Sequence, residues 1–315
     1  MKAKKILLPA AALVLFFSCE GSTYGPFFKD IEKEIELEEL TVKGNIMSIV
    51  EYDGTLYAGG GVIYSKNPGV VGGWSRASSN PDGRVIRLAA GDKLYALTET
   101  IVLSDNNSDN DELWYCLWYL NGGSWVKIRE SQAAMGLFDN GSAAAYVTYD
   151  SKVYSLSGGA VGDEQSGANA QSVSAWGSYF STYPALCSNG SVIFEGRGSV
   201  IYYGNGTSMT AGTDVSNAIT CISYCAGDGY LYVGTETGAK KVHVSGGVPG
   251  GAEDLGMNAD AVLGSYKISA IYAETRPASP TVYAAIVGKS SWQGSKKNGL
   301  WASYAGTDSG NWNAE

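Results

Sequence analysis

The feature that most constrains the fold is a motif that recurs along the chain. It consists of a turn rich in Asp, Asn and Gly, a short apolar strand, and a second apolar strand, as in DGYLYVGTETGAKKVHVSGG at residues 228–247. An apolar pair follows the turn in six copies, at spacings of 38, 59, 39, 39 and 51 residues: Leu56-Tyr57, Leu94-Tyr95, Val153-Tyr154, Val192-Ile193, Leu231-Tyr232 and Val282-Tyr283. The chain therefore contains a repeat of about 45 residues, and a repeat of this length indicates the architecture more strongly than any single motif.

Each copy has the same internal order. A first apolar strand precedes the turn: IMSIVEY, VIRLAA, AAAYVTY, PALCS, ITCISYC and ISAIYAE. A third, outer strand follows the apolar pair: GVIYSKN, LWYCLWYL, ANAQSVSAW, SVIYYGNG, KKVHVSG and GLWASYAG. Several copies end in a segment that carries Trp: GGWSRASS, GSWVKIRE and GNWNAE. With 42 Gly and 21 Tyr in 315 residues, the composition is typical of β proteins with many tight turns.

Four short strands in a unit of this length resemble a blade of a β-propeller. A four-stranded sheet with two apolar faces must bury both of them against neighbours, and closing the ring leaves no face exposed. We therefore predict an all-β fold, a six-bladed β-propeller of four-stranded blades over residues 45–315. A seven-bladed ring, built partly from residues 29–44, is the alternative; the same segment also suits an acidic spacer, a short helix or a closing strand.

The stretch LWYCLWYL supports this interpretation, because large apolar side chains occupy both faces of the strand. A strand tolerates that pattern when it is covered on both sides. The Gly residues that follow the apolar pair are expected to let strands approach closely, and the aromatic residue of the pair is expected to pack between blades. An exposed set of carbohydrate-stacking aromatics is the alternative for this stretch.

The N-terminal residues predict export. Three lysines precede an apolar run of twelve residues, 6–17, which is too short to span a membrane but suits a signal peptide. Ser18 and Cys19 end this run and resemble the lipobox of bacterial lipoproteins; Phe16 replaces the usual Leu, as in the relaxed lipoboxes of spirochaetes. The resemblance implies a signal peptide at residues 1–18 and lipidation of Cys19, with residues 19–44 as a lipid-anchored spacer or closing strand. Ordinary signal-peptidase cleavage, with Cys19 an incidental thiol, is the alternative.

The charge of the mature chain bears on its partners, and the spacing of its cysteines bears on disulfide formation. Removing three lysines with the leader leaves 31 acidic and 19 basic residues, a net charge of −12, which argues against nucleic acid as a partner. Cys221 and Cys225 are four residues apart in one predicted strand, at about 3.3 Å per residue, and so lie too far apart for a disulfide. We expect buried free thiols.

Motifs for catalysis are scarce in this sequence. The single histidine, His243, alternates with valines on a predicted outer strand, and no nucleotide-binding, metalloprotease or dinucleotide motif occurs. The one candidate metal site is the loop SDNNSDNDELW, in which oxygen donors alternate as in a calcium loop: Asp105, Asn107, Asp109 and Asp111. Asn110 and Cys116 replace the Gly and Glu of the EF-hand pattern, so a solvated hairpin loop is the alternative and no other cofactor is expected.

A second predicted loop, residues 158–172, carries the adjacent carboxylates Asp163 and Glu164. Paired carboxylates can act as general acid and base, but this pair gives no reason for different pKa values. The sequence thus favours a non-catalytic binding or assembly module, lipid-anchored at the bacterial cell envelope, periplasmic or surface-facing. Its partner would be an envelope protein or an extracellular ligand. A glycan-active hydrolase or lyase is the alternative.

Overall fold

The computed structural model describes β-strands joined by turns, within one compact unit that begins at Leu40. The described residues are 41–102, 112–139, 144–150, 152–165, 185–205, 208–256, 266–274, 281–287, 298–304 and 312–315. None of them belongs to a helix long and apolar enough to cross a bilayer.

The strands of the described residues form six antiparallel sheets of four. The first two sheets contain β1 (Ser48–Tyr52), β2 (Thr55–Gly60), β3 (Val62–Lys66), β4 (Ser75–Arg76), β5 (Arg84–Ala90), β6 (Leu94–Val102), β7 (Glu112–Asn121) and β8 (Ser124–Ser131). The next two contain β9 (Gly136–Asp139), β10 (Ala145–Tyr149), β11 (Lys152–Ser157), β12 (Ala160–Glu164), β13 (Ala185–Ser188), β14 (Ile193–Arg197), β15 (Val200–Gly204) and β16 (Met209–Asp214). The last two contain β17 (Ile219–Cys225), β18 (Tyr230–Thr235), β19 (Gly238–Ser245), β20 (Val248–Asp254), β21 (Lys267–Ala273), β22 (Val282–Val287), β23 (Gly299–Ser303) and β24 (Trp312–Ala314).

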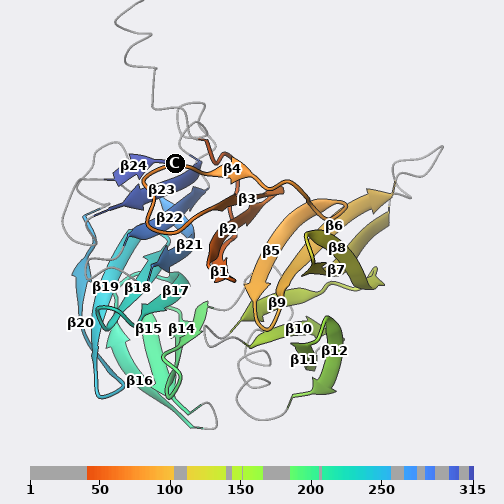
Figure 1. Ribbon diagram of the computed structural model, residues 1–315. Helices are drawn as coiled ribbons and strands as arrows, with labels where there is room; N and C mark the ends of the chain where they lie inside the picture. Colours follow the sequence, from red (N-terminus) through yellow and green to blue (C-terminus); the bar gives the residue numbers. More distant parts are fainter. Residues whose placement is uncertain are drawn as a thin grey trace, which may run out of the picture. The chain divides into compact units, whose positions relative to one another are not determined.

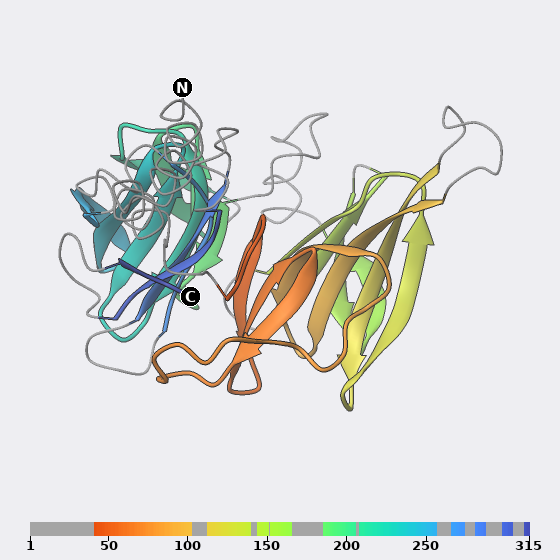
Figure 2. The ribbon, with the colours of Figure 1, turned by 90° about the horizontal axis from the view of Figure 1, so that it is seen from above.

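The six sheets are arranged in a ring, as the blades of a β-propeller (Figure 1). Within each blade the strands follow one another in chain order from the axis outwards, so β1, β5, β9, β13, β17 and β21 surround the centre. The view from above shows the blades standing side by side as twisted sheets (Figure 2). The predicted six-bladed propeller is therefore confirmed, and the seven-bladed alternative is wrong.

The strand assignment of the third blade was wrong by one position. The innermost strand is β9, GLFD, and AAAYVTY and KVYSLS form the second and third strands. The fourth strand, β12, lies in the segment that the sequence predicted as a loop, because Gly158 and Gly159 adopt positive φ (63° and 78°) and join β11 to β12 in a tight turn. The predicted outer strand ANAQSVSAW lies outside the described residues.

The tyrosine of the repeated pair explains how neighbouring blades hold together. Tyr95, Tyr232 and Tyr283 are fully buried among apolar residues, as expected for an aromatic packed between blades. Each hydroxyl donates a hydrogen bond to an acidic side chain beside the preceding turn, at 2.7 Å from Tyr95 to Asp92 and 2.6 Å from Tyr232 to Asp228. The turn carboxylates therefore satisfy polar atoms that would otherwise be costly to bury.

The Gly that follows the pair in the fifth blade allows the close approach that the sequence predicted. A Cβ atom at Gly234 would overlap Cys221 Sγ and lie 2.8 Å from Cγ2 of Ile268, which belongs to the next blade. The stretch LWYCLWYL in β7 is likewise covered on both faces at its centre, where Cys116 and Trp118 are buried on one side and Leu117 on the other. Both observations confirm the packing logic of the repeat.

The four cysteines downstream of Cys19 are free and buried, as predicted: Cys116, Cys187, Cys221 and Cys225. Burial raises the pKa of Cys221 to about 12 and that of Cys225 to about 11. These thiols are accordingly protonated at neutral pH and behave as small apolar side chains.

The first and last described segments meet in the sixth blade. The backbone N–H of Val42 donates to the carbonyl of Glu315 (2.8 Å), and the N–H of Leu300 donates to the carbonyl of Val42 (3.2 Å). The chain entering the first blade is thus hydrogen-bonded to the blade that completes the ring.

A buried ionic cluster joins the first and sixth blades. Lys66 Nζ lies 2.9 Å from the hydroxyl of Tyr283 and 3.7 Å from Oε2 of Glu315, and the Tyr283 hydroxyl donates to Glu274. The side chains of Lys66 and Glu315 are 0% and 2% exposed, and Lys66 Nζ also lies 5.6 Å from the Trp74 ring centroid. Burial lowers the pKa of Lys66 and raises that of Glu315, while their mutual attraction opposes both shifts.

Candidate functional site

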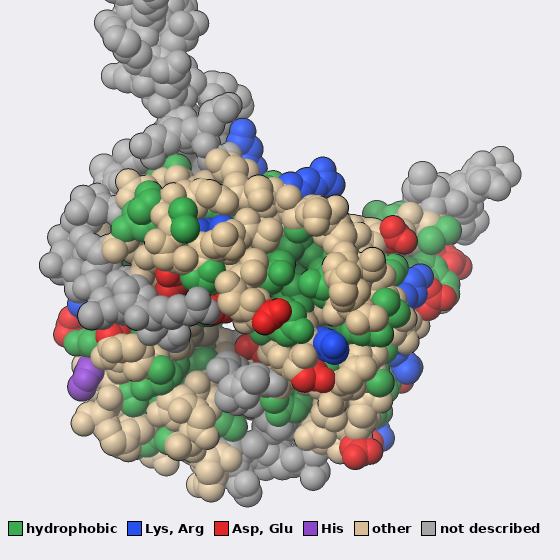
Figure 3. Space-filling view, viewed as in Figure 1, with side chains coloured by type: hydrophobic (Ala, Val, Ile, Leu, Met, Phe, Trp, Pro, Cys, Tyr) green, Lys and Arg blue, Asp and Glu red, His purple; other side chains and the backbone are tan. Residues whose placement is uncertain are grey.

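The inner strands of all six blades enclose a cavity of about 660 Å³ on the axis of the ring. Its walls are built from β1, β5, β9, β13, β17 and β21, together with the turns that follow β1 and β5. Figure 3 shows a hollow near the middle of the ring, with acidic side chains close to it. This position, on the axis of a ring-shaped scaffold, is where concave binding sites of such folds are expected.

Polar side chains hold the inner strands of adjacent blades in place around the cavity. The N–H of Leu88 in β5 donates to Ser48 Oγ in β1 (2.8 Å), and Arg87 Nη1 donates to the carbonyl of Met47 (2.6 Å). Similar contacts join the fifth blade to the sixth through Thr220 and Ile268 (2.5 Å), and the sixth to the first through Ser269 and Ile46. The cavity wall is thereby fixed by contacts between blades.

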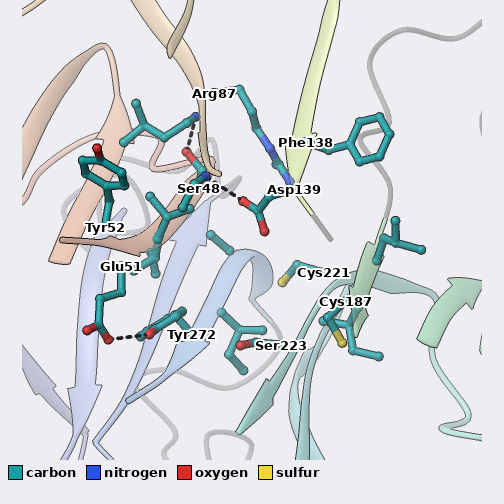
Figure 4. Close-up of a pocket in the computed structure, with 18 of the residues that line it drawn as sticks. Ser48, Glu51, Tyr52, Arg87, Phe138, Asp139, Cys187, Cys221, Ser223 and Tyr272 are labelled. Atoms are coloured by element: carbon teal, nitrogen blue, oxygen red, sulfur yellow. Dashed lines mark hydrogen bonds between the residues drawn. The ribbon is translucent and has the colours of Figure 1, made fainter. Parts of the chain in front are cut away.

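One side of the cavity is acidic. Four carboxylates from the first three blades line it: Glu51, Asp53, Asp92 and Asp139. Asp139 accepts a hydrogen bond from the N–H of Ala90 (3.2 Å), and Glu51 accepts one from the hydroxyl of Tyr272 (3.0 Å; Figure 4). Arg87 is the one basic residue among the described lining residues, and its side chain runs toward Asp139 (Figure 4).

The carboxylate of Asp92 is held in its ionised form. Burial acts to raise its pKa, but hydrogen bonds from the N–H of Gly158 (2.5 Å) and from the hydroxyl of Tyr95 (2.7 Å) outweigh burial and lower the pKa overall. The neighbouring Lys93 lowers it further. A carboxylate stabilised in this way keeps its negative charge at neutral pH.

The opposite side of the cavity is neutral and comes from the last three blades. Ser188, Ser223, Tyr224 and Tyr272 line it, together with Cys187 and Cys221. Figure 4 shows Cys187, Cys221, Ser223 and Tyr272. Burial and the negative charge of Glu51 raise the pKa of Tyr272, so its hydroxyl stays protonated. The cavity therefore contains aromatic and hydroxyl groups as well as carboxylates, and the two sides meet where Tyr272 is hydrogen-bonded to Glu51.

The residues singled out in the sequence lie elsewhere. Cys19 and the candidate calcium ligands Asp105, Asn107, Asp109 and Asp111 are outside the described residues. Asp163 and Glu164 lie on β12, the outermost strand of the third blade; both are exposed, and Glu164 forms an ion pair with Lys152 (2.7 Å). His243 is exposed on β19, with its ring centroid 5.0 Å from that of Tyr230.

Sequence inspection missed the acidic side of the cavity. One sequence pattern indicates this acidic side: two consecutive copies of the repeat carry an acidic residue in the turn after the first strand, Asp53 in DG and Asp92 in GDK. These residues lie 39 positions apart, and only the closed ring shows that both line one cavity.

Comparisons with known proteins give likenesses of fold and none of function. The sequence matches no protein-family model and no curated protein. Among solved structures, one of a nidogen–laminin complex is 12% identical and aligns with 79% of this chain and 88% of that chain, with a TM-score of 0.47. A mitotic checkpoint complex structure is 12% identical (82% and 74% covered, TM-score 0.42). The WD40 β-propeller domain of Doa1 is 10% identical (78% and 93% covered, TM-score 0.40). These likenesses concern the fold alone.

Proposed function

We propose that this protein is an exported lipoprotein, anchored to a bacterial membrane through acyl chains on Cys19, whose propeller binds a partner without catalysing a reaction. The anchor rests on the sequence pattern of a basic segment, a short apolar run and the Ser18-Cys19 pair. The partner is an envelope protein or an extracellular ligand. The net charge of −12 after removal of the leader disfavours nucleic acid.

The observation that carries the binding function is the axial cavity, to which all six blades contribute side chains. Its wall is fixed by hydrogen bonds between adjacent inner strands, such as those of Ser48 and Thr220, so a ligand would meet a largely preformed surface. Preformed sites bind with less loss of conformational entropy, which suits a recognition module.

Lipid attachment is tested by metabolic labelling with an alkyne-bearing palmitate in a bacterial host, comparing the wild-type chain with Cys19→Ala. The wild type should incorporate the label and enter the detergent phase of Triton X-114, whereas the variant should do neither. The four downstream cysteines are buried and thus act as an internal control for nonspecific acylation. Equal labelling of both chains would refute the proposed anchor.

A glycan-active enzyme is the second candidate, and one observation favours it. The axial cavity brings two carboxylates, Glu51 and Asp139, together with Arg87 and Tyr272, whereas Asp163 and Glu164 lie away from that cavity on β12. Paired carboxylates at a sugar-binding site can act as acid and base. Release of reducing ends from envelope glycans by the wild type, and loss of this release in Glu51→Gln, would support the enzyme over the binding module.

A further inference from the structure

We infer that the axial cavity accepts a cationic group, namely the lysine or arginine side chain of a partner protein. This inference rests on the proposed binding function and names the chemistry that the same cavity recognises. Three features of the described lining carry it: an excess of negative charge, aromatic rings near that charge, and a hydroxyl that is open to the cavity.

Charge is the first feature. The lining contains four carboxylates, those of Glu51, Asp53, Asp92 and Asp139, against the single guanidinium of Arg87. Arg87 donates to the carbonyl of Met47 (2.6 Å) and runs toward Asp139 (Figure 4). Lys93 follows Asp92 in the sequence but is not among the lining residues. The remaining negative charge attracts a cation entering from the solvent.

The aromatic rings supply the second feature. Tyr52, Tyr224 and Tyr272 line the cavity and are half-buried, so their rings remain partly accessible. A lysine or arginine head group gains energy when it lies over an aromatic face, and more so where water is partly excluded. Rings combined with carboxylates select a cation over a neutral apolar group.

The third feature is Ser223, which is 9% exposed and lines the cavity from β17. No hydrogen bond joins its hydroxyl to another described residue, and its oxygen is not one of the fully buried side-chain atoms that lack a partner, so this oxygen is accessible from the cavity. An ammonium or guanidinium N–H would satisfy the oxygen of this hydroxyl. This hydroxyl lies on the neutral side of the cavity (Figure 4).

The donor and acceptor balance distinguishes a cation from a neutral sugar. An ionised carboxylate only accepts hydrogen bonds, and a sugar hydroxyl needs acceptors and donors together. In the described lining, four carboxylates face one guanidinium, of which one N–H group donates to Met47, and the hydroxyl of Tyr272 donates to Glu51. The cavity is therefore rich in acceptors, as a site for a cationic N–H donor should be.

The test is isothermal titration of the full chain in detergent with hexalysine and hexaarginine, compared with spermidine, hexaglutamate and chitotetraose. The cavity variant is Glu51→Gln with Asp53→Asn. A matched control, Glu253→Gln with Asp254→Asn, removes two adjacent carboxylates from the outer strand β20, where they pair with Lys241 and Lys240. Urea denaturation of each variant shows whether it is folded.

We expect both basic peptides to bind and the cavity variant to weaken their binding about fivefold, while the control variant changes it less than twofold. Ser223→Ala should weaken binding about threefold, the effect of one lost hydrogen bond. Spermidine binding as tightly as hexalysine would assign the site to free polyamines. Equal effects of the cavity and control variants, or chitotetraose binding that depends on Glu51, would overturn the inference.

The inference and the proposed function fail separately. If the cavity variant loses hexalysine binding but a partner protein is still cross-linked to the wild-type propeller elsewhere, the cationic site stands and the location of partner binding is wrong. If the cavity variant binds hexalysine as tightly as the wild type does, while a partner protein is still cross-linked at the cavity, the proposed binding function stands and the inferred ligand chemistry is wrong.

Discussion

Replacing Lys66 by Met should destabilise the propeller far more than removing the charge of a lysine in an exposed ion pair. The Lys66 ammonium is buried between the first and sixth blades, 3.7 Å from the Glu315 carboxylate and 2.9 Å from the Tyr283 hydroxyl. Met preserves the length and much of the volume of the side chain, so the change removes charge with little loss of packing. It leaves the Glu315 carboxylate, 2% exposed, without its cation.

The magnitude follows from that burial. Removing one partner of a buried ion pair costs about 3–5 kcal/mol because the other charge stays uncompensated. Domains are stable by only about 5–15 kcal/mol, and 1 kcal/mol shifts Tm by about 2–4 °C at this size. We therefore expect Tm to fall by about 10 °C. The double variant Lys66→Met with Glu315→Gln should recover part of this loss, because no buried carboxylate is then left without its cation.

Urea denaturation followed by tryptophan fluorescence measures the effect, since Trp74 lies in the same cluster. Lys152→Met is the matched control: its nitrogen is closer to a carboxylate, 2.7 Å from Glu164, but both side chains are 51% exposed. An exposed pair contributes about 0–1 kcal/mol. If Lys66→Met costs no more than Lys152→Met, the cluster does not stabilise the contact between the first and sixth blades.

Two further predictions concern packing and protonation. Gly234→Ala should cost about 2 kcal/mol or more in urea denaturation, because the new Cβ would overlap Cys221 Sγ, whereas Gly251→Ala, with open space around it, should cost less than about 1 kcal/mol. A similar cost at both positions would contradict the close approach of blades at Gly234. Burial raises the pKa of Cys221 to about 12 and of Cys225 to about 11, against about 8.5 for an unfolded thiol. The folded state therefore keeps protons that the unfolded chain releases, and the free energy of unfolding should fall as pH rises from about 8.5 to about 11. These thiols should also resist Ellman's reagent until urea unfolds the chain, and rapid reaction in the native state would refute their burial.

The architecture was predictable because each copy of the repeat consists of residues that are close together in the sequence. The aromatic residue and the Gly of the fifth blade, Tyr232 and Gly234, have the packing roles that the sequence predicted, whereas the hydrogen bond from Tyr232 to the turn acid Asp228 was not predicted. The third blade was misassigned because the turn and apolar pair of the motif follow its second strand, Ala145–Tyr149, instead of its inner strand, Gly136–Asp139. There the pair Val153-Tyr154 marks the third strand instead of the second.

The candidate site could not be predicted in the same way. Glu51, Asp139 and Ser223 belong to three different blades, and no local pattern links positions so far apart in the chain. Only closure of the ring places them around one cavity. Asp163 and Glu164 are adjacent in the sequence, as a catalytic pair of carboxylates could be, yet they lie on the outermost strand of the third blade.

Site-specific photo-cross-linking tests the central claim, that the axial cavity is the binding site, most directly. A photoreactive phenylalanine analogue would replace Tyr224, which lines the cavity, or Val248, which is exposed on the outer strand β20. In membranes irradiated under identical conditions, the account predicts one stoichiometric protein adduct from position 224 and none from position 248. An adduct formed from position 248 and absent at position 224 would contradict it.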